Sequence, residues 1–156
     1  MPIIHRHPSN PVLSADDVPY DATLIFNAGV TKFRGQYVMV FRNDYGPRNM
    51  ADYQAGTNIR TNLGVAYSDD GVNWRVDPEP CFELKSDTIR RAYDPRLTVI
   101  DDRCYICFAV DTVHGIRGGV AVTDDFKSFE ILSMSGPDNR NTRSTASAAA
   151  SSSPAA

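Results

Sequence analysis

Two segments of this chain repeat the same residue pattern at a fixed offset. GVAYSDDGVNWRV begins at Gly64 and GVAVTDDFKSFEI begins at Gly119, 55 residues later, with glycine, valine, alanine, hydroxyl, Asp-Asp, aromatic and aliphatic positions in step. A second correspondence links GQYVMVFR, from Gly35, to DRCYICFA, from Asp102. Each copy reads as a strand, a turn, a long apolar strand and a further hairpin, without helical spacing. The pattern therefore predicts repeated all-β units.

Repeated all-β units of roughly 50 to 60 residues are typical of β-propeller blades, in which four-stranded sheets stack face to face. The 156 residues of this chain would hold about two blades. The Asp-Asp pairs, Asp69-Asp70 and Asp124-Asp125, are interpreted as turn formers rather than catalysts. The aromatic residues that follow them, Trp74 and Phe129, are expected to pack between blades.

Charge and hydropathy exclude several classes of partner. The formal net charge of -3 and the pI near 5.5 provide no basic field, so we expect neither nucleic acid nor an anionic membrane as a partner. No segment approaches the roughly 20 apolar residues that a spanning helix needs, and the N-terminus lacks the apolar region of a signal peptide. A cytoplasmic location is expected.

The spacing of cysteine and histidine does not suggest a metal or redox site. Cys104 and Cys107 lie three apart in an alternating apolar strand, so their side chains should point to opposite faces and serve packing. With Cys81 they form an odd set that argues against a disulfide framework. The three histidines have no metal-ligand spacing, and no metal is predicted.

One carboxylate, Asp94 in the segment AYDPRLTVIDDRCYICFAV, stands just ahead of a strongly apolar strand. Tyr93 could limit solvent access beside it, and Pro95 restricts the backbone. Arg96, two residues on, would share its strand face and could hold an anion. This pattern suits a strand-borne catalytic acid, but an Asp-Pro pair before a strand is also typical of a simple turn.

Four ordered blocks of this sequence resemble glycoside hydrolase family 130, the β-mannoside phosphorylases. The opening HPSNPVLSADDVPY also looks like the N-terminal segment of that family, so the resemblance covers about residues 5 to 141. The blocks are ATLIFNAGVTKFRGQYVMVFR (22–42), LGVAYSDDGVNW (63–74), YDPRLTVIDDRCYICF (93–108) and GPDNRN (136–141).

The resemblance implies an all-β, five-bladed β-propeller of which about the first two blades are present. It also implies a glycosyltransferase-type glycoside phosphorylase, which converts mannosyl-glucose or β-1,4-mannooligosaccharides to mannose 1-phosphate with inversion. Asp94 matches the catalytic acid, which in the family protonates the glycosidic oxygen through the 3-hydroxyl of the mannosyl unit. Inorganic phosphate would be the co-substrate, and no other cofactor is expected. Because phosphate arrives as an anion, one acid and cationic clamps would suffice.

Block-by-block matching assigns further residues to the site. Asn27 and Arg42 fall where the family contacts the sugar near the scissile bond, and Arg60 and Tyr93 are further substrate-binding candidates. Arg140 resembles a phosphate-binding arginine of the family, since a guanidinium presents a planar fork of donors to phosphate oxygens. Without the resemblance, Arg42 would read as an exposed arginine at the end of a strand.

The sequence departs from the family pattern after Asn141. Residues 142–156 read TRSTASAAASSSPAA, without a large apolar side chain, so we expect residues 1–141 to form a partial propeller domain and the tail to be disordered. Two blades would leave two broad apolar faces in water, from which we expect instability or self-association into a homo-oligomer. The chain alone is expected to be inactive.

Two alternatives remain open. Hydrolytic members of the same family use water in place of phosphate, which would need an added carboxylate base and a depleted basic pocket; Arg140 argues against this. The chain could also be a non-catalytic, carbohydrate-binding fragment, which its length favours and its intact acid segment disfavours.

Overall fold

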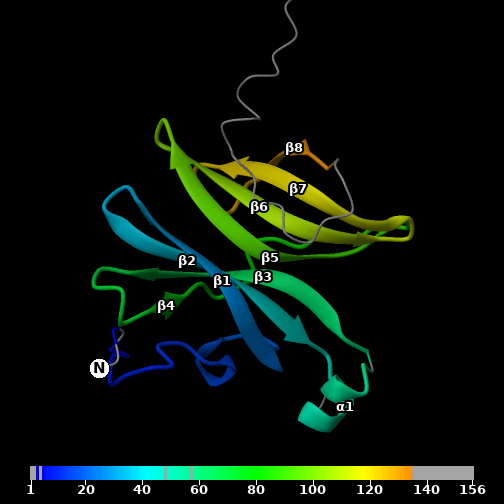
Figure 1. Ribbon diagram of the computed structural model, residues 1–156, viewed down its shortest axis with the longest axis horizontal. Coiled ribbons are helices and arrows are strands. Elements are labelled where there is room, and N and C mark those ends of the chain that lie inside the picture. The colour runs from blue at the N-terminus through cyan, green and yellow to red at the C-terminus, as the bar shows by residue number, and fades with distance from the viewer. Residues whose placement is uncertain (1–2, 4, 48, 57, 135–156) are drawn as a thin grey trace, which may run out of the picture.

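The computed structural model describes residues 3, 5–47, 49–56 and 58–134 (Figure 1). Two four-stranded antiparallel sheets dominate it, with strand orders β1-β2-β3-β4 and β5-β6-β7-β8. Blade 1 contains β1 (Leu24–Phe33), β2 (Gln36–Tyr45), β3 (Arg60–Ser68) and β4 (Arg75–Val76). Blade 2 contains β5 (Ile89–Ile100), β6 (Arg103–Thr112), β7 (Gly115–Thr123) and β8 (Glu130–Ser133). A short helix, α1 (Met50–Gln54), and a 3₁₀ turn, η1 (Ala15–Asp17), complete the described elements.

Each sheet joins its strands in sequential order, as propeller blades do, and the predicted all-β fold of two blades is confirmed. The two predicted hairpin turns lie where the sequence placed them: residues 34–35 join β1 to β2, and residues 101–102 join β5 to β6. The one α-helix among the described residues, α1, has five residues and is too short to show a helical period in the sequence.

The second hairpin turn is built identically in both blades. The Oδ1 atom of Asp70 accepts hydrogen bonds from the backbone N–H groups two and three residues on, both at 2.8 Å, and Asp125 makes the same two bonds. These backbone bonds lower the pKa of both carboxyls. Their predicted role as turn formers is confirmed. Asp69 and Asp124 each accept instead from a side chain at the start of the second strand of their blade.

The main hydrophobic core lies between the two blades. It combines inward residues of β2 and β3 with residues of β5, β6 and β7, and Phe82 from the connection between the blades joins it. The Phe82 ring contacts the rings of Phe108 and Phe129, with centroids 5.1 and 4.9 Å away. Phe129 therefore packs between blades as predicted, whereas Trp74 belongs to a different cluster on the far face of blade 1.

The far face of blade 1 is covered by the N-terminal segment. Val18, together with partly buried Leu13 and Tyr20, packs on Met39 and Phe41, and Phe41 is only 1% exposed. The ribbon shows this segment running beneath the first sheet (Figure 1). The expectation of two open apolar faces is thus wrong for blade 1, because residues ahead of its first strand supply the covering layer.

The two blades differ most in the connection between their second and third strands. In blade 2 only residues 113–114 join β6 to β7, whereas residues 46–59 join β2 to β3 and contain α1. At the start of α1, the Asn49 side chain accepts from the backbone N–H of Asp52 at 2.9 Å, which satisfies one of the free N–H groups there. The longer connection places α1 at the end of the blades where β1, β3 and β5 begin (Figure 1); this is called the α1 end below.

Candidate active site

The site begins with a structural repeat in the innermost strands. Asn27 of β1 and Asp94 of β5 both adopt a left-handed backbone conformation, with φ of 50° and 56°. Each lies within a break in the strand pairing, between Phe26 and Gly29 in β1 and between Tyr93 and Arg96 in β5. A β-bulge at equivalent positions of the two blades therefore redirects one polar side chain from each. A non-glycine residue with positive φ carries strain that is typical of functional sites.

The same aromatic packing lies opposite both bulges. Across each bulge lies a phenylalanine, Phe41 in blade 1 and Phe108 in blade 2, whose ring covers a glycine of the third strand. A Cβ at Gly64 would lie 2.3 Å from the Phe41 ring, and one at Gly119 would lie 2.2 Å from the Phe108 ring. Only glycine leaves room for these rings. The glycines that open both copies of the sequence repeat thus have a structural purpose.

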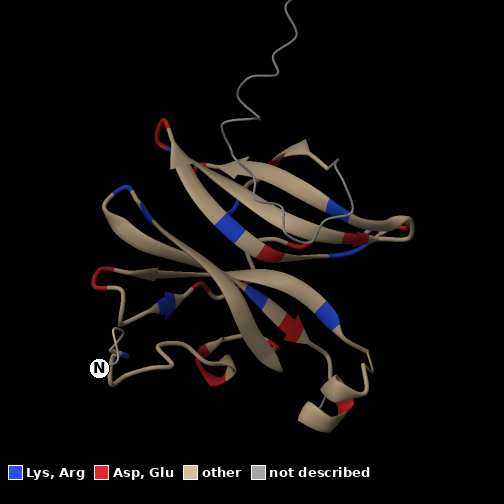
Figure 2. Cartoon of the chain, viewed as in Figure 1, with Lys and Arg blue, Asp and Glu red and all other residues tan. Residues whose placement is uncertain are grey.

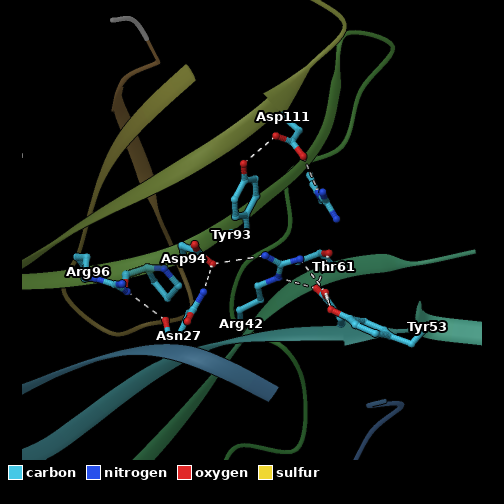
Figure 3. A network of polar contacts seen from close by, with 11 residues as sticks. Asn27, Arg42, Tyr53, Thr61, Tyr93, Asp94, Arg96 and Asp111 are labelled. Atoms are coloured by element: carbon cyan, nitrogen blue, oxygen red, sulfur yellow. Dashed lines mark hydrogen bonds and ion pairs between the residues drawn. The ribbon is translucent and has the colours of Figure 1, made fainter. Parts of the chain in front are cut away.

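A third glycine brings the two inner strands together. A Cβ at Gly29 would lie 2.8 Å from the Pro95 carbonyl oxygen and 3.1 Å from the Arg96 Cα, so the backbones of β1 and β5 touch at this point. This close approach lets the Asn27 Nδ2 donate to Asp94 Oδ1 at 2.9 Å. The predicted sugar-binding residue and the predicted acid are therefore direct neighbours, each from a different blade (Figure 3).

Both protein contacts of the Asp94 carboxylate converge on one oxygen. Oδ1 accepts from Asn27 at 2.9 Å and faces a guanidinium nitrogen of Arg42 at 3.5 Å. Within the described part of the chain no hydrogen bond reaches Oδ2, and the Asp94 side chain is 31% exposed. One carboxylate oxygen is thus held by two side chains, and the other accepts no hydrogen bond from a described residue.

Arg42 is fixed on all sides. Its guanidinium lies over the Phe26 ring at 4.5 Å and the Tyr93 ring at 4.9 Å. Two of its nitrogens donate to the two oxygens of Asp44, at 2.8 and 2.7 Å, in a bidentate pair. Stacking and forked hydrogen bonds both suit the planar guanidinium. The charge beside Asp94 therefore has little freedom to move.

Asp44 holds the Arg42 guanidinium in position. Its side chain is fully buried and also accepts from the hydroxyls of Thr61 and Tyr53, both at 2.7 Å. Burial alone would raise the pKa of Asp44, but the hydrogen bonds from Arg42, Thr61 and Tyr53 outweigh burial and lower the pKa. A buried carboxylate with four short hydrogen bonds is an ionised partner that keeps Arg42 charged.

Tyr93 supports Arg42 from the other blade. Its hydroxyl donates to Asp111 Oδ1 at 2.8 Å, and Asp111 in turn accepts from Arg91 Nε at 2.7 Å (Figure 3). The Tyr93 side chain is buried, and the Arg42 guanidinium lies over the Tyr93 ring. The Tyr93 ring thus stacks on the Arg42 guanidinium, and the Tyr93 hydroxyl is bound to Asp111.

Other predicted residues lie apart from this cluster. Arg60 is exposed and stacks on the Tyr45 ring at 4.7 Å, without a contact to Asp94. Arg96 donates to the backbone carbonyls of Asn27 and Pro95, because the bulge interrupts the alternation that would have placed it on the same face as Asp94. Arg140 lies outside the described residues.

Sequence reasoning missed the residues that position Arg42. Asp44 follows Arg42 by two residues on β2, but Thr61 comes from β3 and Tyr53 from α1. An Arg-x-Asp pair on one strand was the available signal, because alternate residues share a face. Nothing in the sequence around Tyr53 indicates that α1 would fold over this pair.

The cysteines and histidines form no metal or redox site among the described residues. Cys104 and Cys107 are both buried and form no disulfide with a described residue, and burial raises the pKa of Cys104 to about 12. Among the described residues, no three His, Cys, Asp or Glu side chains meet in a way that could hold a metal ion. The helices in that part of the chain are also too short or too polar to cross a membrane.

The fold and site together define a β-propeller protein with a polar site where the innermost strands of two adjacent blades meet. The sequence profile of glycoside hydrolase family 130, described as beta-1,4-mannooligosaccharide phosphorylase, matches residues 4–152. The chain therefore belongs to glycoside hydrolase family 130, a family of enzymes with phosphorylase and hydrolase members.

Individual relatives agree with this membership. The beta-1,4-mannooligosaccharide phosphorylase of Ruminococcus albus is 30% identical, over 81% of this chain and 37% of the relative. The beta-1,2-mannobiose phosphorylase of Listeria innocua has a similar fold, with a TM-score of 0.66 at 18% identity, covering 83% of this chain and 50% of that one. A structure described for family members that hydrolyse beta-1,2 mannosidic linkages in Candida mannan gives a TM-score of 0.67 at 20% identity, covering 83% and 40%. The structural likenesses, at such low identity, show the fold alone, and the chain spans half or less of each relative.

Proposed function

We propose that this chain carries the acid-bearing part of an inverting β-mannoside phosphorylase that yields mannose 1-phosphate from mannosyl-glucose or β-1,4-mannooligosaccharides. Asp94 would be the catalytic acid and Asn27 and Arg42 would contact the sugar. The observation that carries this proposal is the partly exposed carboxylate of Asp94, whose Oδ1 is held in place by Asn27 and Arg42 while Oδ2 accepts no hydrogen bond from a described residue. The Ruminococcus albus relative, described as a mannooligosaccharide phosphorylase, supports the substrate class.

The contacts of Asp94 suit proton delivery through a substrate hydroxyl. A hydroxyl at Oδ2 can exchange a proton with the carboxyl group while Oδ1 keeps its two protein donors. Fixed donors on one oxygen also orient the carboxyl group before the substrate arrives, so that little reorganisation is needed during the reaction. Arg42 beside it would stabilise negative charge on the sugar oxygens.

No other carboxylate in the described Asp94 network is placed as the base that hydrolysis would need. An inverting hydrolase needs a second carboxylate to activate water. In the described network Asp44 is buried with four hydrogen bonds, and Asp111 is held by Tyr93 and Arg91. Neither is placed to activate water, whereas phosphate needs no such base. Arg140 would be its clamp, as the family resemblance implies.

The test measures mannose 1-phosphate and free mannose released from β-1,4-mannobiose and mannosyl-glucose, with and without phosphate. It uses this chain and a chimera in which residues 4–134 replace the matching segment of the Ruminococcus albus phosphorylase. We expect the chimera to release mannose 1-phosphate only with phosphate, and Asp94→Asn to lower its rate by about 10² to 10⁴.

Asp124→Asn is the matched control, because this carboxylate pairs with Arg103 in a hairpin turn at the other end of blade 2. It should leave the rate unchanged. Free mannose released without phosphate would favour the hydrolase instead, as in the family members that act on Candida mannan. Full activity of the Asp94→Asn chimera would exclude the proposed acid.

A further inference from the structure

A cavity of about 470 Å³ opens at the α1 end of the molecule, between blade 1 and the start of blade 2. Its walls come from the start of β3, the connection between the blades and the start of β5. Figure 2 shows basic segments at the starts of both strands, on the side that carries α1. The charged lining residues are the cations Arg60, Lys85, Arg90 and Arg91 and the carboxylates Glu83 and Asp111.

The two carboxylates of this cavity already have partners. Asp111 accepts from Arg91 at 2.7 Å and from the Tyr93 hydroxyl at 2.8 Å. Glu83 faces the Tyr45 hydroxyl at 3.4 Å, and the ring of Tyr45 carries Arg60 at 4.7 Å. Contacts to neighbouring groups thus hold Arg60 and Arg91 at the cavity wall.

The other two cations, Lys85 and Arg90, are exposed and form no ion pair with any described residue. The cavity therefore has four cations against two carboxylates, although the chain as a whole has a net charge of -3. A local excess of positive charge in a concave, partly enclosed site attracts anions more strongly than scattered surface charges do. Such a surplus in an acidic protein points to a ligand.

This cavity is separate from the Asp94 carboxylate. Arg91 precedes Asp94 by three residues on β5, which corresponds to roughly 10 Å along a strand. The Asp94 side chain does not line the cavity. Tyr93 links the two places, because its hydroxyl binds Asp111 at the cavity wall while its ring lies under Arg42.

We propose that this cavity is a second anion site, which binds a phosphate group independently of Asp94. Three guanidinium groups offer planar forks for phosphate oxygens, and Lys85 adds a mobile point charge. Ile59 and Ile89 in the lining provide apolar surface against which a sugar ring can pack. The phosphate group could belong to inorganic phosphate or to a sugar phosphate. The inference goes beyond the proposed phosphorolysis and does not depend on it.

The experiment titrates the ¹⁵N-labelled full chain with inorganic phosphate, mannose 1-phosphate and, as a neutral control, mannose. We expect both anions to shift the signals of residues 83–91 with saturation, and mannose to leave them unchanged. A lower dissociation constant for mannose 1-phosphate than for phosphate would assign the site to a sugar phosphate, and equal constants would assign it to the phosphate group alone. Absence of saturable shifts with both anions would overturn the inference.

Charge-matched variants separate specific binding from general attraction. Lys85→Gln with Arg90→Gln should weaken binding at least tenfold, as removal of two charge-assisted contacts implies. The control is Arg75→Gln with Arg103→Gln, which removes the same charge from exposed arginines away from the α1 end. Equal weakening by both pairs would show that net charge alone attracts the anion and would overturn the proposal.

Two further variants separate this site from the proposed catalysis. Asp94→Asn and Arg140→Gln, each made in the full chain, should leave the titration of residues 83–91 unchanged, although Asp94→Asn slows turnover in the chimera. Loss of binding in either variant would mean that the anion occupies the site of Asp94 or Arg140, and the inference would fail. A chimera without phosphorylase activity would reject the proposed function but leave this titration as it is.

Discussion

Asp44 decides how the site is charged, although it does not contact Asp94. Its two oxygens hold the guanidinium of Arg42, and the Thr61 and Tyr53 hydroxyls fill its remaining acceptor positions. Desolvated ion pairs are costly unless further hydrogen bonds support them, and here each oxygen of Asp44 accepts two. The result is a cation whose position beside Asp94 does not depend on a bound ligand.

Two substitutions separate the charge of Asp44 from its hydroxyl partners. Asp44→Asn leaves a buried guanidinium without its carboxylate, so the free energy of unfolding should fall by about 3–5 kcal/mol. Tyr53→Phe removes one hydrogen bond to a charged group and should cost about 1.5–3 kcal/mol. Urea denaturation at pH 7 measures both. If the two variants lose equal stability, the ion pair is not the dominant interaction.

The pH dependence of the same variants provides a second check. Because the folded state lowers the pKa of Asp44, its stabilising effect is present above the ordinary carboxyl pKa of about 4 and is lost as the pH falls through the lowered value. The stability difference between wild type and Asp44→Asn should therefore be largest near neutral pH and shrink below about pH 4. A constant difference down to pH 3 would contradict this assignment.

Among the strands, the bulges in β1 and β5 convert a repeated unit into a site with two different groups. The same bulge, with a phenylalanine opposite and a glycine beneath that ring, presents an amide in blade 1 and a carboxylate in blade 2. Since both residues point to the line where the inner strands meet, Asn27 binds Asp94 directly. The repeated bulge gives both side chains the same backbone geometry, and the change from Asn27 to Asp94 provides the carboxyl group.

Gly29→Ala tests the close approach of these strands. The added Cβ would meet the Pro95 carbonyl, so β1 and β5 must separate, at a cost of about 1–3 kcal/mol of unfolding free energy. In the chimera the substitution should also slow phosphorolysis by more than the stability loss explains, because Asn27 moves away from Asp94. Val30→Ala, next in the strand and 49% exposed, is the control and should change neither quantity measurably. An unaltered rate for Gly29→Ala would argue against this role.

At the scale of the whole molecule, the segment that connects the blades, residues 77–88, packs against the shared core through Phe82. Leu63 and Phe82 are paired through a backbone bond of 2.8 Å, which draws the connecting segment against β3. The Phe82 ring then fills the space among Phe108 and Phe129. With the N-terminal segment on the far face of blade 1, this blade is covered on both sides.

Phe82→Ala should therefore loosen both blades together. Removing this ring from the shared core should lower the free energy of unfolding by about 3–5 kcal/mol, with a single transition for both sheets. Urea unfolding is followed by the fluorescence of Trp74, which reports blade 1, and by circular dichroism, which reports both sheets. Leu132→Ala, 40% exposed on β8, should cost less than about 0.5 kcal/mol. Two separate transitions in wild type would show that the blades unfold independently.

Local patterns were sufficient to predict the strands and the turns, whereas the site residues were assigned by the family resemblance. Alternating apolar residues mark β2 and β6, and Asp-Asp turns mark the outer hairpins, because these features depend on neighbours along the chain. The segments around Asn27, Arg42, Tyr93 and Asp94 resemble family blocks, and these four residues indeed lie together. Arg60 lies apart on the Tyr45 ring. A family resemblance assigns a role to a residue but does not give its distance from the others.

Other features depended on contacts between distant segments. The register break that turns Arg96 away from Asp94, the Gly29 contact with Pro95, and Tyr53 above Asp44 each join residues from different strands or loops. The order of residues dictates which backbone shapes and faces are available, since those follow from neighbours a few positions away. Which faces meet, and therefore which charges are buried together, follows from how the two blades pack, because burial and electrostatic pairing act through space.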